Sequence, residues 1–193
     1  MKKLFVILVA ILALVMSLDL SRVAAGQGEI PLSVLAGGYA SIVPGSFAIC
    51  LNPATFLEES CTTAGALVIP LTSMNVGKVI MDSNGNACGT YSEVNSNLPV
   101  DASPPQVVAL NVAAKLLNYD PASGTGDESF TSYTGGKCNG AAFDSVGATV
   151  IGTGTDHFTA SGNGKRIDGI FTSLTDAVGG IGDFSFSFFN LKQ

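Results

Sequence analysis

The chain has 193 residues, of which nine are basic and 15 are acidic, and its formal net charge is −6. A chain this acidic lacks the positive surface with which proteins bind DNA, RNA or anionic lipids. The composition therefore excludes nucleic acid as a partner, and the length is that of one ordinary domain.

The N-terminal residues predict a secretory signal peptide. The charged pair Lys2-Lys3 precedes an apolar run from Leu4 to Met16, and the small residues Val23-Ala24-Ala25 follow. This run is shorter than the roughly 20 apolar residues of a membrane-spanning helix, and the pattern is typical of a cleaved leader. We expect cleavage after residue 25, with a retained anchor as the alternative. The product would be a single domain, residues 26–193, exported to the periplasm or out of the cell, with no membrane partner.

Removal of residues 1–25 takes away three of the nine basic residues and one of the 15 acidic residues, so the net charge changes to −8. All four cysteines remain, and an even number in an exported chain indicates two disulfides. Three pairings are possible. We favour Cys50–Cys61 and Cys88–Cys138, because the first pair encloses a short, self-contained segment. A four-cysteine zinc site would need Cys-x₂-Cys spacings, which are absent, so we expect no metal and no cofactor.

The composition of the mature region predicts an all-β fold. All 23 glycines lie after residue 25, and they separate short runs rich in Val, Ile, Phe, Thr and Ser. Such runs between turn residues are typical of strands. Near the C-terminus Phe184, Phe186 and Phe188 alternate with serines, which places three rings on one face of a strand.

Three segments predict strand–turn–strand units, at 78–91, 116–126 and 157–172. The first contains Asn84-Gly85, which suits a tight hairpin. Hairpins at such intervals predict an antiparallel meander that forms a barrel or a sandwich. Asn52-Pro53 predicts one short helix near 53–59, because Asn caps helices and Pro suits their first position. The prolines of 95–106 indicate an exposed loop.

These elements resemble exported bacterial proteins with calycin-like barrels, the architecture of the lipocalins. The resemblance rests on four segments: 35–40 (Leu-Ala-Gly-Gly-Tyr-Ala), the hairpin at 82–90, Gly124-Thr125-Gly126, and 158–168. Lipocalins carry Gly-x-Trp near the first strand, where the Trp helps to close the barrel base. This chain has no Trp, and Gly37-Gly38-Tyr39 would take that place. The resemblance implies a single closed barrel and no particular ligand.

The candidate catalytic residues do not assemble into a site. His157 is the only histidine, and Asp156 precedes it, but adjacent strand residues point to opposite faces. No serine lies in a Gly-x-Ser-x-Gly turn. We therefore expect His157 at the surface or the barrel rim and assign no catalytic residue.

Three further patterns also have simpler interpretations. The segment from Asp82 to Asn86 with Glu93 resembles a calcium loop, but Ala87 stands where such a loop needs Gly, so a hairpin is expected. Gly162–Arg166 lacks the spacing of a phosphate loop and is expected to be a turn. Glu58-Glu59 is expected to be solvated.

The phenylalanines leave two possibilities for the barrel interior. Phe47, Phe158, Phe171 and the stripe at 184–188 could line a cavity or fill a solid core, and we favour the filled core. The leading hypothesis is an exported, non-catalytic barrel that binds an apolar small molecule, with ligand-binding residues unknown.

Two other classes of function remain open. A structural or adhesive surface protein would fit the polar composition, in which only 12% of residues are charged. The predicted architecture also resembles the allene oxide cyclase barrel. A cyclase- or isomerase-like enzyme of this kind would need polar groups inside the cavity. The residues to locate for that possibility are His157, Tyr39, Tyr91, Tyr119 and Tyr133.

Overall fold

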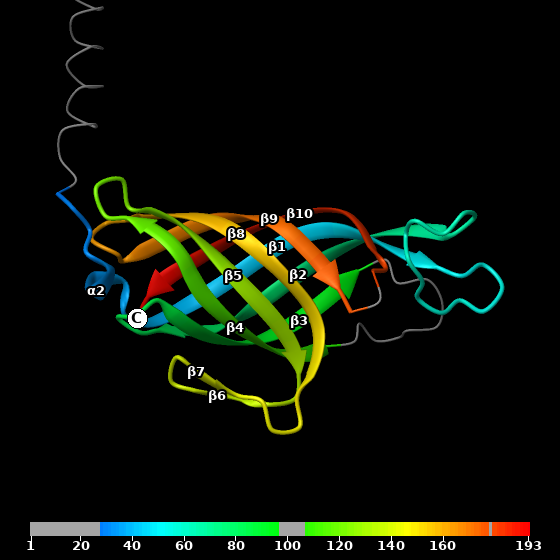
Figure 1. Ribbon diagram of the computed structural model, residues 1–193, viewed down its shortest axis with the longest axis horizontal. Coiled ribbons are helices and arrows are strands. Elements are labelled where there is room, and N and C mark those ends of the chain that lie inside the picture. Colours follow the sequence, from blue (N-terminus) through cyan, green and yellow to red (C-terminus); the bar gives the residue numbers. More distant parts are fainter. Residues whose placement is uncertain (1–27, 97–106, 178) are drawn as a thin grey trace, which may run out of the picture.

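The protein is a closed antiparallel β-barrel (Figure 1). The computed structural model describes residues 28–96, 107–177 and 179–193. The predicted signal peptide and most of the predicted loop at 95–106 lie outside these residues. Eight strands close the barrel in the order β1-β10-β9-β8-β5-β4-β3-β2, so each strand pairs with its neighbour along the chain, apart from a small inserted hairpin.

The elements of the described chain have the following bounds. The barrel strands are β1 (Gly37–Leu51), β2 (Leu67–Met81), β3 (Asn86–Ser96), β4 (Val107–Asp120), β5 (Thr125–Thr134), β8 (Thr149–Ser161), β9 (Arg166–Asp176) and β10 (Ile181–Lys192). The inserted hairpin consists of β6 (Lys137–Asn139) and β7 (Ala142–Asp144), and the helix α2 (Leu32–Leu35) precedes β1.

The all-β prediction and its three hairpins are confirmed, because β2–β3, β4–β5 and β8–β9 pair as adjacent antiparallel strands. The short helix expected near 53–59 is wrong. The Asn52 side chain does accept hydrogen bonds from the backbone N–H groups of Ala54 and Thr55, as a cap would. However, Phe56 adopts a positive φ of 56°, which is incompatible with a continuing helix, so the segment is a turn. Within the described ranges the helix is α2, which was not predicted.

Aromatic rings inside the barrel lie over glycines of the neighbouring strand. In five cross-strand pairs, a Cβ atom added to the glycine would collide with the ring of the residue directly opposite. The pairs are Gly45–Phe186, Gly77–Tyr91, Gly126–Phe158, Gly154–Phe130 and Gly169–Phe188. Because glycine has no side chain, each ring can lie against the barrel wall at these positions.

The barrel end next to α2 is closed by buried side chains. Leu35 is completely buried there, beside Phe158 and Ile167. The hydroxyl of Tyr39 donates a hydrogen bond to the carbonyl oxygen of Leu35 at 2.6 Å and lies 3.1 Å from that of Gly164. Tyr39 of Gly37-Gly38-Tyr39 thus helps to close this end, as expected from its position.

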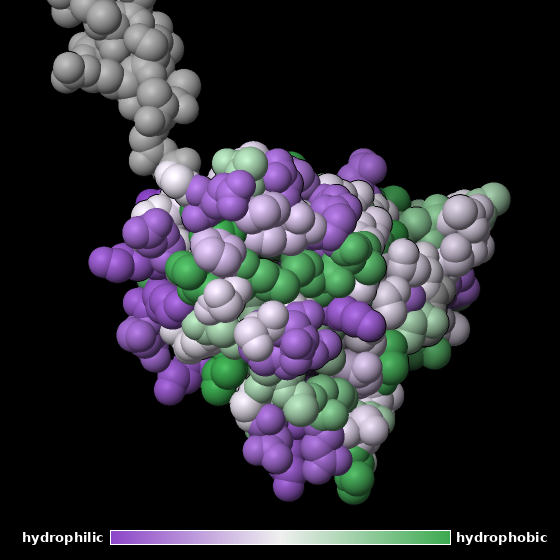
Figure 2. Space-filling model, turned by 60° about the vertical axis from the view of Figure 1, so that its left-hand side comes forward, coloured by the Kyte–Doolittle hydropathy of each residue, from purple (hydrophilic) through white to green (hydrophobic). Residues whose placement is uncertain are grey.

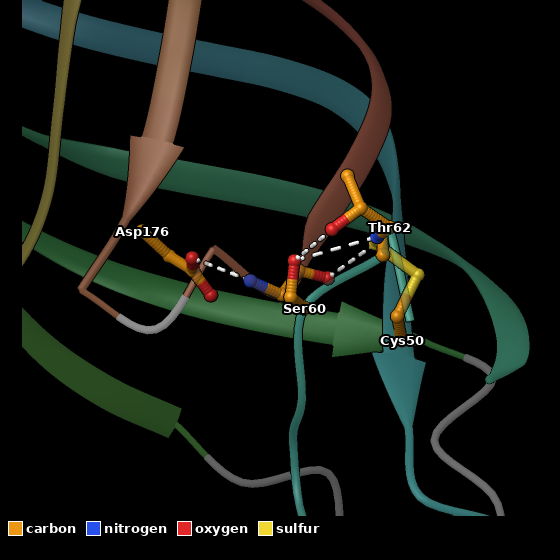
Figure 3. The surroundings of a disulfide bond; sticks show 6 residues. Cys50, Ser60, Thr62 and Asp176 are labelled. Carbon is orange, nitrogen blue, oxygen red and sulfur yellow. Dashed lines mark hydrogen bonds between the residues drawn. A yellow bond between two sulfur atoms is a disulfide. The ribbon is translucent and has the colours of Figure 1, made fainter. Parts of the chain in front are cut away.

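Both favoured disulfides, Cys50–Cys61 and Cys88–Cys138, are present. The first links Cys50 at the end of β1 to Cys61 in the connection that follows (Figure 3). The backbone N–H groups of Cys50 and Cys61 donate to the carbonyl oxygens of Gly180 and Gly179, at 2.9 and 3.2 Å, and hold this connection against the segment that leads into β10. The second ties the β6–β7 hairpin to the outside of β3. The chain-entropy model assigns these bridges about 3 and about 4 kcal/mol, because they close short and longer loops respectively.

Replacement of a glycine beneath a ring is expected to destabilise the barrel. In Gly169→Ala the new Cβ would meet the Phe188 ring and would lie 2.7 Å from the carbonyl oxygen of His157. We expect a loss of about 1–3 kcal/mol in the free energy of unfolding, measured by urea denaturation. Gly38→Ala is the matched control, because nothing lies within 4 Å of its added Cβ. Equal stability of the two variants would contradict the role given to the glycine.

Candidate functional site

A cavity of about 190 Å³ occupies the barrel interior. The rings of Phe130, Phe171, Phe186 and Phe47 form a continuous row beside it, with successive centroids 4.7, 5.3 and 5.8 Å apart. The expected solid core is therefore wrong for this part of the barrel. Of the rings that sequence reasoning assigned to a core, Phe47, Phe171, Phe186 and Phe188 line this cavity, whereas Phe158 is buried in the core cluster.

Two buried acidic side chains face this apolar space from neighbouring strands. Glu128 of β5 and Asp156 of β8 stand directly opposite each other in the strand register, and both line the cavity. Glu128 is only 8% exposed and Asp156 only 5%. Directly opposed residues have Cβ atoms about 4.5–5.5 Å apart, so the two carboxyl groups are close neighbours.

Both carboxyl groups are buried without full hydrogen bonding. Glu128 Oε1 and Asp156 Oδ1 have no hydrogen-bond partner among the described residues. Burial raises the pKa of Glu128 to about 7. Burial, followed by the proximity of Glu128, raises the pKa of Asp156 to about 8. The pair therefore holds protons near neutral pH and can release them when a cation approaches.

Tyr91 adds a hydroxyl group to this polar wall. Its side chain lines the cavity, and its hydroxyl lies 3.2 Å from Ser41 Oγ on β1. Burial raises the pKa of Tyr91 to about 12, and the nearby Glu128 and Asp156 add to the increase. The hydroxyl is therefore a neutral donor and acceptor at physiological pH.

The other tyrosines predicted as candidates lie elsewhere. Tyr39 closes the α2 end, and the Tyr119 hydroxyl donates to the carbonyl oxygen of Ile30 at 2.7 Å near the same end. Tyr133 stacks on Phe143 of the inserted hairpin, with centroids 4.2 Å apart. Of these four tyrosines, the structure brings only Tyr91 to the cavity.

His157 lies on the outside of the barrel, while its neighbour Asp156 faces the interior. The opposite orientation expected for this pair is confirmed. On the outer surface His157 Nδ1 is 2.7 Å from Asp127 Oδ1, and Asn118 Nδ2 donates to Asp127 Oδ2 at 2.7 Å. These two hydrogen bonds lower the pKa of Asp127, that from His157 having the larger effect. The cluster is exposed and separated from the cavity by the barrel wall.

The patterns that resembled ion-binding loops form turns. Asp82 accepts hydrogen bonds from the backbone N–H groups of Asn84 and Asn86 at 2.8 and 2.9 Å, which stabilises the β2–β3 hairpin. Gly162–Arg166 connects β8 to β9, with Asn163 at a φ of 57°. Glu93 faces the interior, where it accepts a hydrogen bond from Ser73 at 2.9 Å.

A second acidic pair lies near the Cys50–Cys61 disulfide. Glu58 is exposed, as expected, and its carboxyl group lies beside that of Asp176 at the end of β9. Partial desolvation, followed by the neighbouring Asp176 carboxyl group, raises the pKa of Glu58 to about 7. One oxygen of Asp176 accepts a hydrogen bond from Gly180 N–H at 2.7 Å, so this pair stabilises the turn before β10 (Figure 3).

Sequence reasoning missed Glu128 and Asp156, although a signal was present. Glu128 shares the parity of Phe130 in β5, and Asp156 shares that of Phe158 in β8. In a strand, residues two apart point to the same face, so the phenylalanines placed both acids inside. Asp156 was considered only as a partner of His157.

Within the described ranges, no group of three or more His, Cys, Asp or Glu side chains is arranged to hold a metal ion. In the same ranges, no helix has the length and apolar character needed to cross a membrane. No protein-family model, curated protein or solved structure matches the chain.

The buried acids predict a decline of stability with rising pH. Their pKa values in the folded state lie above the ordinary values of 3.8 and 4.5, so folding favours the protonated forms. This contribution is complete below about pH 4 and is lost as the pH rises through about 7 to 8, with a slope of about 1.4 kcal/mol per pH unit for each proton. We expect urea denaturation from pH 5 to 9 to show this decline, and Glu128→Gln with Asp156→Asn to remove most of it.

Asp183→Asn is the control for this measurement, because Asp183 is exposed on β10. It should leave the decline unchanged. Glu58→Gln is measured separately, since the raised pKa of Glu58 contributes in the same pH range. A double variant with the slope of the wild-type protein would show that the two acids are not buried as described.

Proposed function

We propose that the protein is an exported, calycin-like barrel that binds a small, largely apolar molecule in its interior. The observation that carries this proposal is the cavity of about 190 Å³, whose wall contains both a row of phenylalanines and two buried acids. Eight-stranded barrels are just wide enough to be filled by side chains or to hold one small ligand. Apolar pockets with a few convergent polar groups are the usual form of a ligand site.

The cavity volume limits the size of the ligand. A buried apolar cavity of about 150 Å³ is large enough to bind benzene. The cavity here is slightly larger, at about 190 Å³, so a single six-membered ring with a short substituent fits. The neighbouring phenylalanine rings favour an aromatic or compact aliphatic body, since they offer apolar surface and edge or face contacts.

Export to the periplasm or the extracellular space is consistent with the two disulfides, which persist in oxidising compartments. The calycin-like assignment is supported by the up-and-down order of the strands and by the closure of one end by Tyr39. Export and the calycin-like assignment are both part of the proposal.

A second candidate, an isomerase-like enzyme, is favoured by one observation. Glu128, Asp156 and Tyr91 converge in the cavity, and a carboxyl group with a pKa near 7 to 8 can donate or accept a proton near neutral pH. Binding and catalysis differ in the fate of the ligand. Compounds recovered unchanged from the protein support binding, and conversion to a product of equal mass, lost in Asp156→Asn, supports catalysis.

The structural or adhesive alternative is favoured by apolar side chains on the outside of the barrel. Ile42 is 46% exposed and lies opposite Val76, which is 53% exposed, and opposite Phe189 on the other side. The face in Figure 2 also shows a band of hydrophobic residues between hydrophilic groups. Ordered oligomers in light scattering, reduced to monomers by Ile42→Lys, would favour this alternative.

Filling the cavity is expected to abolish binding of apolar probes. Ala114 of β4 lines the cavity, and Ala114→Phe would occupy the space with a ring. We expect indole or benzyl alcohol to bind the wild-type protein and to lose roughly tenfold or more in affinity to this variant, measured by isothermal titration calorimetry.

Ala109→Phe is the matched control, because Ala109 is exposed on the outside of the same strand. It should bind the probes as the wild-type protein does. If the wild-type protein binds no probe, or if Ala114→Phe binds as well as Ala109→Phe, the proposed function is wrong.

A further inference from the structure

The buried polar atoms of the cavity that lack a hydrogen-bond partner are all oxygens. Four buried oxygens have no hydrogen-bond partner among the described residues and belong to side chains that line the cavity. They are Glu128 Oε1, Asp156 Oδ1, Asn75 Oδ1 and Asn190 Oδ1. Ionised carboxylates and amide oxygens accept hydrogen bonds and donate none. A ligand that satisfies them must therefore bring donors.

The cavity also lacks positive charge. None of its lining residues in the described chain is Lys, Arg or His. The titratable groups that face the acidic pair are Tyr91 and Glu93, both on β3, while the lining residues of the other strands are apolar, amide or hydroxyl side chains. Asp127, on the outer surface, adds a further negative charge near Asp156. Among the residues that the structure describes, no cation lines the cavity to neutralise Glu128 and Asp156.

An anionic ligand is therefore excluded, because it would enter an apolar space beside two carboxyl groups. A neutral hydrocarbon would leave four buried acceptors without partners, which is unfavourable because their hydration is lost and nothing replaces it. A protonated primary amine carries three donors and a positive charge on a small head, and it matches both the acceptors and the sign of the field.

We propose that the cavity selects small apolar molecules that carry a protonated primary amine, with the ammonium group held between Glu128 and Asp156 and the apolar body against the phenylalanine row. This inference rests on the proposed function, since it names the class of ligand for the same cavity. The aromatic faces of the row add cation–π attraction to the ammonium group.

Binding of such a ligand changes the protonation of the acids. Near pH 6 both carboxyl groups hold their protons, and the ammonium ion enters with its own charge. The ion stabilises the carboxylate form, so at least one carboxyl group releases its proton to solvent and an ammonium–carboxylate pair remains. Charge balances, because one cation enters the cavity and one proton leaves it.

The test compares three probes of similar shape by isothermal titration calorimetry at about pH 8, namely benzylamine, benzyl alcohol and benzoate. We expect benzylamine to bind roughly tenfold or more tightly than benzyl alcohol, and benzoate to bind more weakly than either. Repeating the benzylamine titration at about pH 6 in two buffers of different ionisation enthalpy should reveal release of about one proton per ligand. Benzyl alcohol should release none.

Two variants test whether Glu128 and Asp156 cause the preference for the amine. Glu128→Gln with Asp156→Asn keeps the shape of both side chains and removes their charge. We expect it to lower the affinity for benzylamine to that for benzyl alcohol, which should bind unchanged. Asp183→Asn is the control for the overall negative charge, because Asp183 lies exposed on β10, and it should keep the preference for the amine.

The outcomes separate this inference from the proposed function. Equal binding of amine and alcohol, tighter binding of alcohol, or a preference that survives in the double variant would overturn the amine inference and leave the apolar binding site in place. A preference lost in Asp183→Asn would also overturn it, since the attraction would then be to the outer surface. Failure of all three probes to bind would overturn both.

Discussion

The pairing of aromatic rings with glycines across neighbouring strands is the constraint on which the interior of the barrel depends. An eight-stranded barrel has little internal space, and bulky side chains directed to its axis would fill it. Gly45, Gly154 and Gly169 let rings lie against the wall, at positions where any side chain would collide with them. The rings therefore supply the apolar surface of the cavity, and the glycines beneath them leave its centre open. Glycine in a strand has an entropic cost, and here it is associated with the close approach of a ring.

The two ends of the barrel are built differently. At the α2 end, Leu35 and Tyr39 are buried and the Tyr39 hydroxyl ties the helix to the β8–β9 turn. At the other end, the Cys50–Cys61 disulfide closes the connection after β1, and the backbone N–H groups of Cys50 and Cys61 donate to Gly180 and Gly179 in the segment before β10. Cavity residues such as Leu174 and Ile181 near this end are only half-buried. The packed core is thus concentrated at the α2 end, and the cavity extends away from it.

The sequence was sufficient to predict the strands, the hairpins and both disulfides, because these follow from local signals. Alternation fixes which residues share a face, Asn84-Gly85 specifies a tight turn, and the spacing of the cysteines favours one pairing. The helix expected after Asn52 does not form, because Phe56 adopts a positive φ and ends the turn there. A capping residue alone does not specify a helix. The solid core was wrongly preferred, because whether rings fill or line a barrel depends on cross-strand register. That register places Phe130, Phe186 and Phe188 over glycines of the neighbouring strands.

Strand register also determines the position of the acidic pair. Glu128 and Asp156 are 28 positions apart in the numbering of the chain, and only the pairing of β5 with β8, across the inserted hairpin, makes them direct neighbours. Burial of two such groups without counter-charges opposes folding, because each must either remain protonated or stand as an unpaired charge in an apolar space. The disulfides offset part of this cost, at about 3 and 4 kcal/mol in the chain-entropy model. A fold that keeps two destabilising carboxyl groups beside an otherwise apolar cavity departs from the local rules of stability at one place, and such departures mark functional sites. In this barrel that place is the wall formed by β5 and β8.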